Sequence, residues 1–526
     1  MNAKVVINVV SALVVLTGLS MSVCLIPAWI MDMPEGNEQV FWNFLWCSLS
    51  TIAIGTVVFL KTRVKADVGF REGFAVVTFG WLAVSAFGAL PYLWICKDPV
   101  ALHQTLEQIQ ALDVAMGEEA RIAKIAELMD ATKSISVADA FFETMSGFTT
   151  TAASIMMDIE AQPYGILFWR SLTNWLGGMG IVVLSLAILP VLGIGGMQLY
   201  KAEVPGPTSD QLTSRITSTA KILWLVYFVL SIACFVILKT MGMGWFDSIC
   251  HTFSTLATGG FSTKDASIGA FAPHFHVVIT FFMFLGGCNF VLHIKALKGK
   301  PLFYFKDEEF RFYFFCVAAA IIIVTLSLVF NGNKEGATYT VAQALNSASF
   351  QVVSIITTTG YGSDDYTLWP TLAMGIIVLF FFFGGCGGST SGGMKISRLM
   401  LMLKYSIVQV KQCLFPHALS NVQLNKKRVQ PAILDKVLSF FFLYIAIYIF
   451  ISLLLCLCDG IDIETAFSGS IACLGNIGPG LSQVGPSANY AWMPDSAKWL
   501  LSLAMLIGRL EVYTVIVLLL PQFWKK

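Results

Sequence analysis

The sequence predicts an all-α polytopic membrane protein with ten transmembrane helices, four re-entrant half-helices and a fourfold internal repeat. The chain has 526 residues, of which 56% are hydrophobic and only 12% are charged, and its mean hydropathy is +0.74. Soluble proteins carry about 25% charged residues. The apolar residues gather in runs long enough to cross a hydrocarbon core of ~30 Å as helices. In addition, one short polar turn recurs at nearly constant intervals.

Two apolar runs, at 5–29 and 40–60, stand before the first copy of the repeat. The first run is longer than the apolar core of a signal peptide and lacks an A-x-A-like cleavage site, so we expect a retained transmembrane helix. Further runs of spanning length occur at 222–240, 312–330 and 433–457.

Basic segments alternate with acidic or neutral ones along the chain, as the positive-inside rule requires. The basic segments are 61–71, 201–221, 293–311, 395–411 and 425–428, and the acidic or neutral ones are 32–38, 98–130 and 458–464. If the N-terminus is cytoplasmic, an even number of spans returns the C-terminal "PQFWKK" to the same side. We therefore expect both termini in the cytoplasm.

Four copies of a Thr/Gly or Asn/Gly turn divide the chain: "TTTA" (149–152), "LATGGFST" (256–263), "TTTG" (357–360) and "GNIGPGL" (475–481). Aligned on Ala152, Gly259, Gly360 and Gly478, they recur at intervals of 107, 101 and 118 residues. A fixed period of this kind indicates internal repeats. The predicted units are two leading helices (1–65), repeat 1 (66–200, with an outer insertion at 96–135), repeat 2 (201–311), repeat 3 (312–415) and repeat 4 (416–526).

Each repeat has the same order of elements: a long span, a shorter stretch, the polar turn, and a second span with internal glycines. The shorter stretches, of ~12 residues, cannot cross a bilayer; they are 136–148, 245–257, 343–356 and 463–474. The second spans lie near 165–190, 271–292, 370–383 and 497–520. Irregular backbone at membrane depth must be buried in protein or line a wet cavity. Four such loops are best satisfied by converging on one axis; the alternative is four ordinary extracellular turns.

Such converging turns suit a cation filter that is lined by backbone carbonyls. Inward-facing carbonyls require unusual φ/ψ values, which glycine adopts without penalty, and threonine adds a hydroxyl and a stiff side chain. Half-helices that aim their C-terminal ends at the axis favour cations there. The predicted lining residues are Thr150, Thr151, Ala152, Ala257, Thr258, Gly259, Thr358, Thr359, Gly360, Asn476, Ile477 and Gly478.

The third copy, "TTTGYG", resembles the potassium-channel filter loop T-V-G-Y-G. Ala152 is the one aligned position that is not glycine. An alanine held at positive φ costs roughly 1–2 kcal/mol. The sequence therefore leaves the choice between K⁺ and Na⁺ open. Asp364 and Asp365, just past the third loop, either concentrate cations at the mouth or form a solvated turn.

Motifs along nearly the whole chain resemble the TrkH/TrkG/KtrB superfamily of potassium-uptake proteins, and within it the TrkH branch. The motifs are "FFETMSGFTTT" (141–151), "GIGGMQLYKAEVPGP" (193–207), "HTFSTLATGGFSTKDASIG" (251–269), "GGCNFVLHIKALKG" (286–299), "TTTGYGSDDY" (357–366), "GGCGGSTSGGMKISR" (384–398) and "NIGPGLSQVGP" (476–486). The resemblance implies four channel-like span–loop–span repeats around one pore, in the bacterial inner membrane. It also implies a homodimer in which each protomer has its own pore.

The stretch "GGCGGSTSGG" holds six glycines in ten residues and cannot keep a regular helix, at ~1 kcal/mol per glycine. The resemblance implies a mobile intramembrane gate below the filter, formed by Gly384, Gly385, Gly387, Gly388, Ser389, Thr390, Ser391, Gly392 and Gly393. The alternative is a small-residue packing face.

Arg509 lies near the middle of the last span, where an arginine costs ~2.5–3.5 kcal/mol on insertion scales and should face a cavity. The resemblance implies that Arg509 faces the pore below the filter, as an electrostatic barrier or a support for the gate. The alternative is a packing arginine bonded to carbonyl oxygens. Glu511, two residues on, cannot share its helical face, so the two are not an obvious pair.

These observations favour a potassium-uptake subunit with channel-like conduction of K⁺, alone or together with Na⁺. The alternatives are a cation-coupled symporter, for which Glu143 and Glu511 are the candidate relay carboxylates, and a Na⁺-permeable transporter. An enzyme is not expected, because no nucleophile–base pair, metal cluster or G-x-S-x-G is visible. No cofactor is expected besides the transported ion.

The expected partners are a second copy of the chain, membrane lipid and a cytosolic nucleotide-binding gating ring of the TrkA type; no nucleic acid is expected. The ring is implied by the resemblance, and it must be a separate chain because no strand-then-GxGxxG unit occurs here. The outer insertion, 96–135, is polar with helical periodicity. It is either a surface helical hairpin or a weakly cation-attracting funnel.

Overall fold

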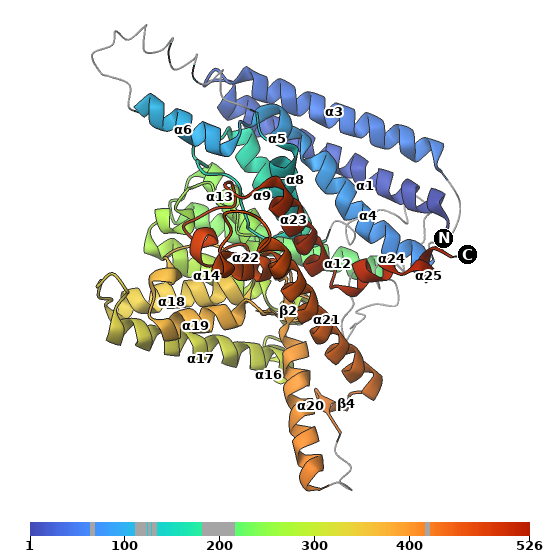
Figure 1. Cartoon of the computed structure of the whole chain (residues 1–526), viewed down its shortest axis with the longest axis vertical. Helices are drawn as coiled ribbons and strands as arrows, with labels where there is room; N and C mark the ends of the chain where they lie inside the picture. The colour runs from blue at the N-terminus through green and yellow to red at the C-terminus, as the bar shows by residue number, and fades with distance from the viewer. Residues whose placement is uncertain are drawn as a thin grey trace.

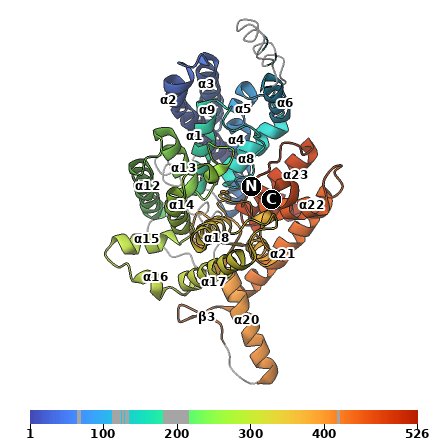
Figure 2. The ribbon, with the colours of Figure 1, turned by 90° about the vertical axis from the view of Figure 1, so that its left-hand side faces the viewer.

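The computed structural model describes residues 1–63, 69–110, 124, 128, 134–180, 216–415 and 421–525. The described chain is mostly helical, and its helices surround a central region where the short helices meet (Figures 1 and 2). Two leading helices, α1 (Ala3–Val23) and α3 (Glu38–Lys61), pack side by side. Their close approach requires glycine, because a β-carbon at Gly18 would lie 2.7 Å from the Ile52 side chain.

Each of four segments contains a long helix, a short helix and a second helix. The first helices are α4 (Phe70–Gly88, continued by α5, Leu90–Ile95), α12 (Ile216–Thr240), α17 (Glu308–Asn331) and α21 (Pro431–Leu455). The short half-helices are α8 (Val137–Thr149), α13 (Trp245–Leu256), α18 (Val341–Ile356) and α22 (Ile463–Leu474). The second helices are α9 (Tyr164–Gly178), α14 (Pro273–Gly286), α19 (Thr371–Phe380) and α23 (Asp495–Arg509).

Polar residues fix where three of the half-helices begin. The side chains of Ser136, Thr340 and Asp462 each accept a hydrogen bond from a backbone N–H in the first turn. Such N-caps satisfy donors that the helix itself leaves unpaired. The half-helices therefore start at defined points and run toward the centre of the molecule, where the polar turns follow them.

The segments pack in a cyclic order. The second helix of one segment contacts the half-helix of the next, in the pairs α9–α13, α14–α18 and α23–α8. The last pair joins the fourth segment back to the first. Figure 2 shows α8, α13, α18 and α22 placed around the middle of the molecule. This arrangement positions the four polar turns at one place.

The described chain does not reach the predicted ten spans. Six helices within it are long and apolar enough to cross a membrane, or up to eight if each of two bent pairs is one span. The bent pairs are α14 with α15 (Phe290–Leu297), at 103°, and α23 with α24 (Tyr513–Leu519), at 116°. α9, which ends at Gly177 and Gly178, and α19, which ends at Phe380, are shorter. Residues 181–190 of the predicted 165–190 span lie outside the described ranges.

The remaining elements lie at the periphery or in loops. Helices α2 (Leu25–Pro27), η1 (Ala28–Asp32), α6 (Pro99–Gln110), η2 (Ser267–Ala270), α16 (Phe303–Lys306), η3 (Tyr366–Leu368), η4 (Ser482–Val484) and α25 (Pro521–Trp524) are short. Strands β1 (Phe383–Gly384) and β2 (Met394–Lys395) pair in parallel, and β3 (Gln423–Leu424) and β4 (Lys427–Arg428) form an antiparallel hairpin. Helix α20 (Ile396–Leu414) projects from the body with the end of α21 (Figure 1).

The two chain ends lie next to each other (Figure 1). The Arg71 guanidinium donates to the Lys525 carbonyl over 2.6 Å, and Met1 and Trp524 line one cavity. In the outer insertion, α6 is helical as predicted and contacts the body through His103, whose ring nitrogen lies 3.0 Å from the Asp158 carboxylate. Most of residues 111–133 of the insertion, and the 193–207 motif, lie outside the described ranges.

Candidate functional site: four polar turns around one axis

The four polar turns share one backbone conformation. Each half-helix ends in a residue at φ 53–56°, namely Thr150, Thr258, Thr358 or Asn476. The N–H of the next residue then returns to a carbonyl in the half-helix, over 2.8–2.9 Å in each of the four turns. This left-handed ending satisfies carbonyls that the helix end leaves unpaired. The same turn chemistry at the same place in each repeat excludes four unrelated surface turns.

A second positive φ follows two residues later, at Ala152 (64°), Gly260 (67°), Gly360 (81°) and Gly478 (99°). The residue between the two is not at positive φ in any of the four turns. Alternation of this kind turns successive carbonyls toward the same side, as a carbonyl-lined filter requires. The triplets that share this conformation are Thr150–Thr151–Ala152, Thr258–Gly259–Gly260, Thr358–Thr359–Gly360 and Asn476–Ile477–Gly478.

The second triplet corrects the predicted register by one residue. The sequence alignment places Gly259 opposite Ala152, whereas the positive φ falls on Gly260. Gly260 therefore joins the site, and Ala257, at the αR C-cap of α13, leaves it. The physical reason is that "ATGG" offers two consecutive glycines, and only the backbone conformation distinguishes them.

The third residue of each glycine-containing triplet packs against a backbone carbonyl of the turn from the next repeat. A β-carbon at Gly260 would lie 1.9 Å from the Thr359 carbonyl oxygen, and one at Gly360 would lie 2.0 Å from the Ile477 oxygen. At Gly478 the nearest atom would be the Thr151 oxygen, at 2.4 Å. Because real β-carbons do not come this close, glycine is required at these positions. Each glycine thus faces a carbonyl of the next turn, and the contacts run from repeat 2 through 3 and 4 to 1.

Ala152 is the equivalent third residue in repeat 1. Its methyl group lies 2.7 Å from the positions that β-carbons on Gly260 and Gly360 would take, and 2.8 Å from that on Gly478. The four positions therefore point toward one spot, and only repeat 1 places an atom there. The alanine also keeps positive φ, so the turn bears the backbone strain that the sequence predicts.

A buried ion pair between Arg170 and Glu143 holds the segments that follow the turns of repeats 1 and 2. Arg170 on α9 and Glu143 on α8 are 1% and 0% exposed, and Nε lies 2.8 Å from Oε1. Glu143 also accepts from the Ile155 N–H over 2.9 Å and from the Ser154 hydroxyl, while Arg170 donates to the Ser262 carbonyl over 3.1 Å. The pair therefore fixes the chain that leaves both turns.

Hydrogen bonds between side chains join the turns further. Thr149 and Thr151 share a bond of 2.7 Å between their hydroxyls, and Thr357 and Thr359 share one of 2.8 Å. The Asn476 amide crosses from repeat 4 to the Thr151 hydroxyl, over 3.0 Å.

A cavity of about 190 Å³ opens above the four third positions, which form part of its lining. Its wall carries Arg170, Lys264 and Asp265. Burial raises the pKa of Asp265, and the Ile159 N–H, which donates to the carboxylate, lowers it in part. The cavity is therefore polar and borders all four turns.

Asp364 and Asp365 belong to a structured turn beside the third loop. Asp364 accepts from the Tyr339 hydroxyl over 3.0 Å, and Asp365 accepts from the Thr367 N–H. Neither residue is part of the cavity lining. The structure thus favours a structural turn at Asp364 and Asp365 over a role of these carboxylates in concentrating cations.

The glycine-rich loop, Gly384–Gly393, lies against the other end of the turns. The Ser391 hydroxyl donates to the Thr357 carbonyl over 2.5 Å, and the Gly392 N–H donates to the Thr358 hydroxyl over 2.6 Å. Thr390 reaches the second turn, where its hydroxyl lies 3.3 Å from that of Thr258. The loop is flanked by β1 and β2, and it does contact the turns predicted above it.

Arg509 ends α23 and binds the same loop. Its guanidinium donates to the Thr390 carbonyl over 2.9 Å and to the Gly177 carbonyl over 2.6 Å. It therefore bonds to carbonyls, as the packing alternative requires, and one of these carbonyls belongs to the glycine-rich loop. Glu511 does not pair with it and forms an ion pair with Arg398 instead.

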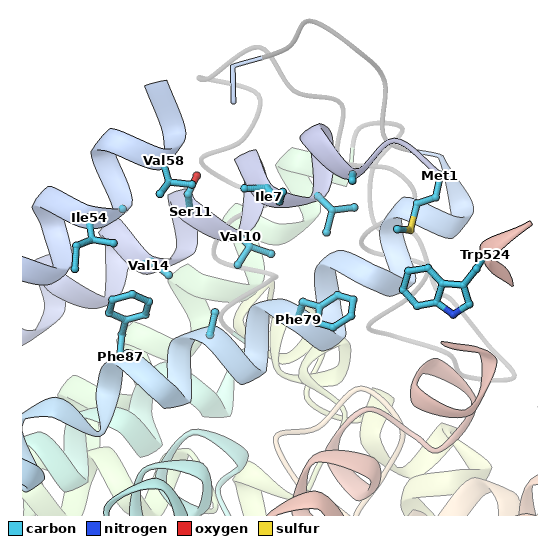
Figure 3. A pocket seen from close by; sticks show the side chains of 14 residues that line it. Met1, Ile7, Val10, Ser11, Val14, Ile54, Val58, Phe79, Phe87 and Trp524 are labelled. Carbon is cyan, nitrogen blue, oxygen red and sulfur yellow. The ribbon is translucent and has the colours of Figure 1, made fainter. Parts of the chain in front are cut away.

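A second cavity, of about 370 Å³, lies away from the turns between α1, α3 and α4 (Figure 3). Val10, Ile54, Phe79, Phe87 and Trp524 are among the apolar side chains that line it. Ser11 is the polar side chain labelled in this lining, which is otherwise mostly apolar, so this cavity differs in character from the polar one beside the turns.

Comparisons with known proteins found several similar chains. Residues 72–526 match the family model described as "TrkH: Cation transport protein". A "Trk system potassium uptake protein TrkH" of Salmonella typhimurium is 38% identical and covers 94% of this chain and 93% of its own. A "Trk system potassium uptake protein TrkG" of Escherichia coli K12 is 33% identical over 100% of this chain and 99% of its own. The crystal structure of the potassium transporter TrkH from Vibrio parahaemolyticus superposes with a TM-score of 0.81, at 33% identity and full coverage of both chains.

Proposed function

The chain belongs to the TrkH family of cation transport proteins, and from that premise we propose that it is the membrane subunit of a potassium-uptake system. In this proposal K⁺ passes along the axis of the four turns, which serve as its selectivity filter. The single observation that supports it most strongly is the ring of contacts from Gly260 through Gly360 and Gly478 to Thr151. Carbonyl oxygens held at such a ring replace the hydration shell of a monovalent cation.

Channel-like conduction is favoured over coupled symport by the state of the two candidate relay carboxylates. Glu143 is paired with Arg170, and Glu511 is paired with Arg398. A coupled transporter needs a carboxylate that is open to the coupling ion, and both of these carboxylates are instead held by arginine side chains. The symporter and the Na⁺-permeable transporter therefore stay as alternatives that the experiment below distinguishes.

The glycine-rich loop is the proposed gate, because it lies directly against the second and third turns through Thr390, Ser391 and Gly392. Arg509 is its proposed support from repeat 4. Six glycines make this segment poor in regular structure, so it can change conformation at low cost. A shift of the loop would break its hydrogen bonds with the filter residues.

We further propose a homodimer, for which α20 offers a surface. Leu403, Ile407, Val410 and Leu414 are 47–72% exposed and recur at helical spacing along this projecting helix. An exposed apolar stripe of this kind fits a partner surface or lipid. The regulatory subunit is proposed to be a separate nucleotide-binding ring of the TrkA type on the cytoplasmic side.

The proposed orientation places both termini in the cytoplasm of a bacterial cell and the chain in its inner membrane. The adjacency of the N-terminus and residues 524–525 supports termini on one side. The exposed basic residues of the β3–β4 hairpin fit the cytoplasmic side by the positive-inside rule.

Reconstituted protein tests the conduction mechanism directly. Purified chain in liposomes, with a K⁺ gradient but equal pH and equal Na⁺ on both sides, should carry K⁺ down its own gradient. The flux should not change when a pH or Na⁺ gradient is added. A flux that requires either gradient would support symport instead, and a Na⁺ flux equal to the K⁺ flux would support the Na⁺-permeable alternative.

A further inference from the structure

Three consecutive acidic residues at the start of α17 contact three different parts of the protein. Asp307 is the N-cap of the helix and accepts from the Phe310 N–H over 2.9 Å. Glu308 binds Lys404 of α20, with Nζ 2.6 Å from Oε2. Glu309 turns inward and is only 8% exposed. The start of α17 is therefore a junction between the surface and the glycine-rich loop.

On the surface side, the junction is held by the tip of the β3–β4 hairpin. The Asn425 side chain accepts from the Glu308 N–H over 2.8 Å and donates to the Asp307 carboxylate over 2.9 Å. Asn425 and Lys426 form the two-residue turn, at φ 49° and 63°, as expected for the tightest hairpin connections. Lys404 also donates to the Gln423 carbonyl, so the hairpin and α20 hold the same helix start.

On the inner side, Glu309 holds the glycine-rich loop. Its Oε1 accepts from the Gly387 N–H over 2.6 Å. A buried carboxyl group is costly unless hydrogen bonds satisfy it, and the Gly387 N–H supplies one. Glu309 thus fixes the first half of the loop, while Arg509 fixes Thr390 in the second half.

We propose that Glu309 is a positioning residue that holds the glycine-rich loop in place, and that the hairpin, through Asn425, controls the position of Glu309. The inference rests on the proposed role of this loop as a gate. Asn425 binds the residue directly before Glu309, so displacement of the hairpin shifts the helix start and the Glu309–Gly387 bond together. Through Ser391 and Gly392 the loop then transmits the shift to the filter.

Single-channel recording of the full-length protein in lipid bilayers, without any cytosolic partner, tests the proposal. Glu309→Leu removes the acceptor for the Gly387 N–H at similar volume, and Asn425→Gly removes the amide while glycine keeps the positive φ. Each should raise the ratio of open to closed time roughly 10- to 100-fold, the range expected when a buried donor is left without its acceptor. The K⁺/Na⁺ permeability ratio should not change, which also reports an intact filter.

Two matched variants serve as controls. Glu309→Gln keeps an acceptor oxygen, so its ratio of open to closed time should stay near that of the native chain. Lys426→Gly alters the other exposed turn position, and its open probability should equal that of the native chain. The double variant Glu309→Leu/Asn425→Gly should open no more than Glu309→Leu alone, because both substitutions act on one contact chain.

A shortened-loop variant separates this inference from the gate itself. If deletion within 387–393 opens the pore while Glu309→Leu and Asn425→Gly gate as the native chain does, the inference is overturned and the gate stands. If the deletion also leaves gating unchanged, the proposed gate fails, and the inference fails with it. Because Asn425 lies on the surface, Asn425→Gly gives a result even if Glu309→Leu does not fold.

Discussion

The methyl group of Ala152 lies 2.7 Å from the position that a β-carbon on Gly360 would take, so residues 208 positions apart in the sequence meet at one spot. Gly260 and Gly478 point to the same spot. This convergence defines one axis for the four turns. Repeat 1 differs from the other three because it alone carries a side chain at this position. The functional account depends on this relationship.

Adding a methyl group at Gly360 should abolish K⁺ flux. The new β-carbon would lie 2.0 Å from the Ile477 carbonyl oxygen, at a residue held at φ 81°. Gly375→Ala is the matched control within α19, because nothing lies within 4 Å of its added β-carbon. Liposome flux assays should show loss for Gly360→Ala and native flux for Gly375→Ala. Native flux in both would remove Gly360 from the pathway.

Breaking the Glu143–Arg170 pair should destabilise the protein more than replacing both residues. Arg170→Leu leaves a buried carboxylate without its partner, which costs about 3–5 kcal/mol, whereas removal of both charges is often nearly neutral. Thermal unfolding of the detergent-solubilised chain should show a large drop in midpoint for Arg170→Leu. The double variant Glu143→Leu/Arg170→Leu should recover part of it; a drop equal to the sum of the Arg170→Leu and Glu143→Leu drops would show that the two residues act independently.

Arg509→Ala should increase basal K⁺ flux, because it frees the Thr390 carbonyl and removes a positive charge below the filter. Arg509→Lys keeps the charge but offers fewer donors, so its flux should fall between those of Arg509→Ala and the native chain. The measurement is the initial rate of flux per reconstituted protein. An unaltered rate in Arg509→Ala would reduce this arginine to a packing role.

Charge on the α20 stripe should separate the proposed dimer. Ile407→Glu and Val410→Glu place carboxylates on exposed apolar positions that are 55% and 65% accessible in one chain. Light scattering of the purified protein in detergent should report half the native mass. Gln409→Glu adds the same charge outside the stripe and should leave the mass unchanged. A dimer that survives both stripe variants must use another surface.

The repeat and the half-helices could be predicted from the sequence, because span length and hydropathy act locally. The predicted stretch 463–474 coincides with α22, and 343–356 differs from α18 by two residues. The number of spans could not be predicted, because bends near Gly287 and Arg509 interrupt apolar runs that read as continuous.

Only part of the candidate site could be predicted, because some of its residues are set by local sequence and others by contacts within the fold. The repeat alignment located Ala152, Gly360 and Gly478 to the residue, but it could not choose between Gly259 and Gly260. Arg170 carries a signal that the sequence analysis did not use, since it lies within an apolar span as Arg509 does. Glu309 and Asn425 carry no such signal, because their roles depend on contacts with Gly387 and Glu308 that only the fold creates.

The reversal potential in mixed K⁺ and Na⁺, compared between the native chain and Ala152→Gly, tests the central claim most directly. Ala152→Gly removes the one methyl group at the axis and the strain of alanine at φ 64°. Ala153→Gly, at a buried neighbour, is the control. The account predicts that Ala152→Gly alone moves the reversal potential toward the K⁺ equilibrium value. Equal reversal potential and conductance in the native chain and Ala152→Gly would contradict a filter in which Ala152 is one of the four walls.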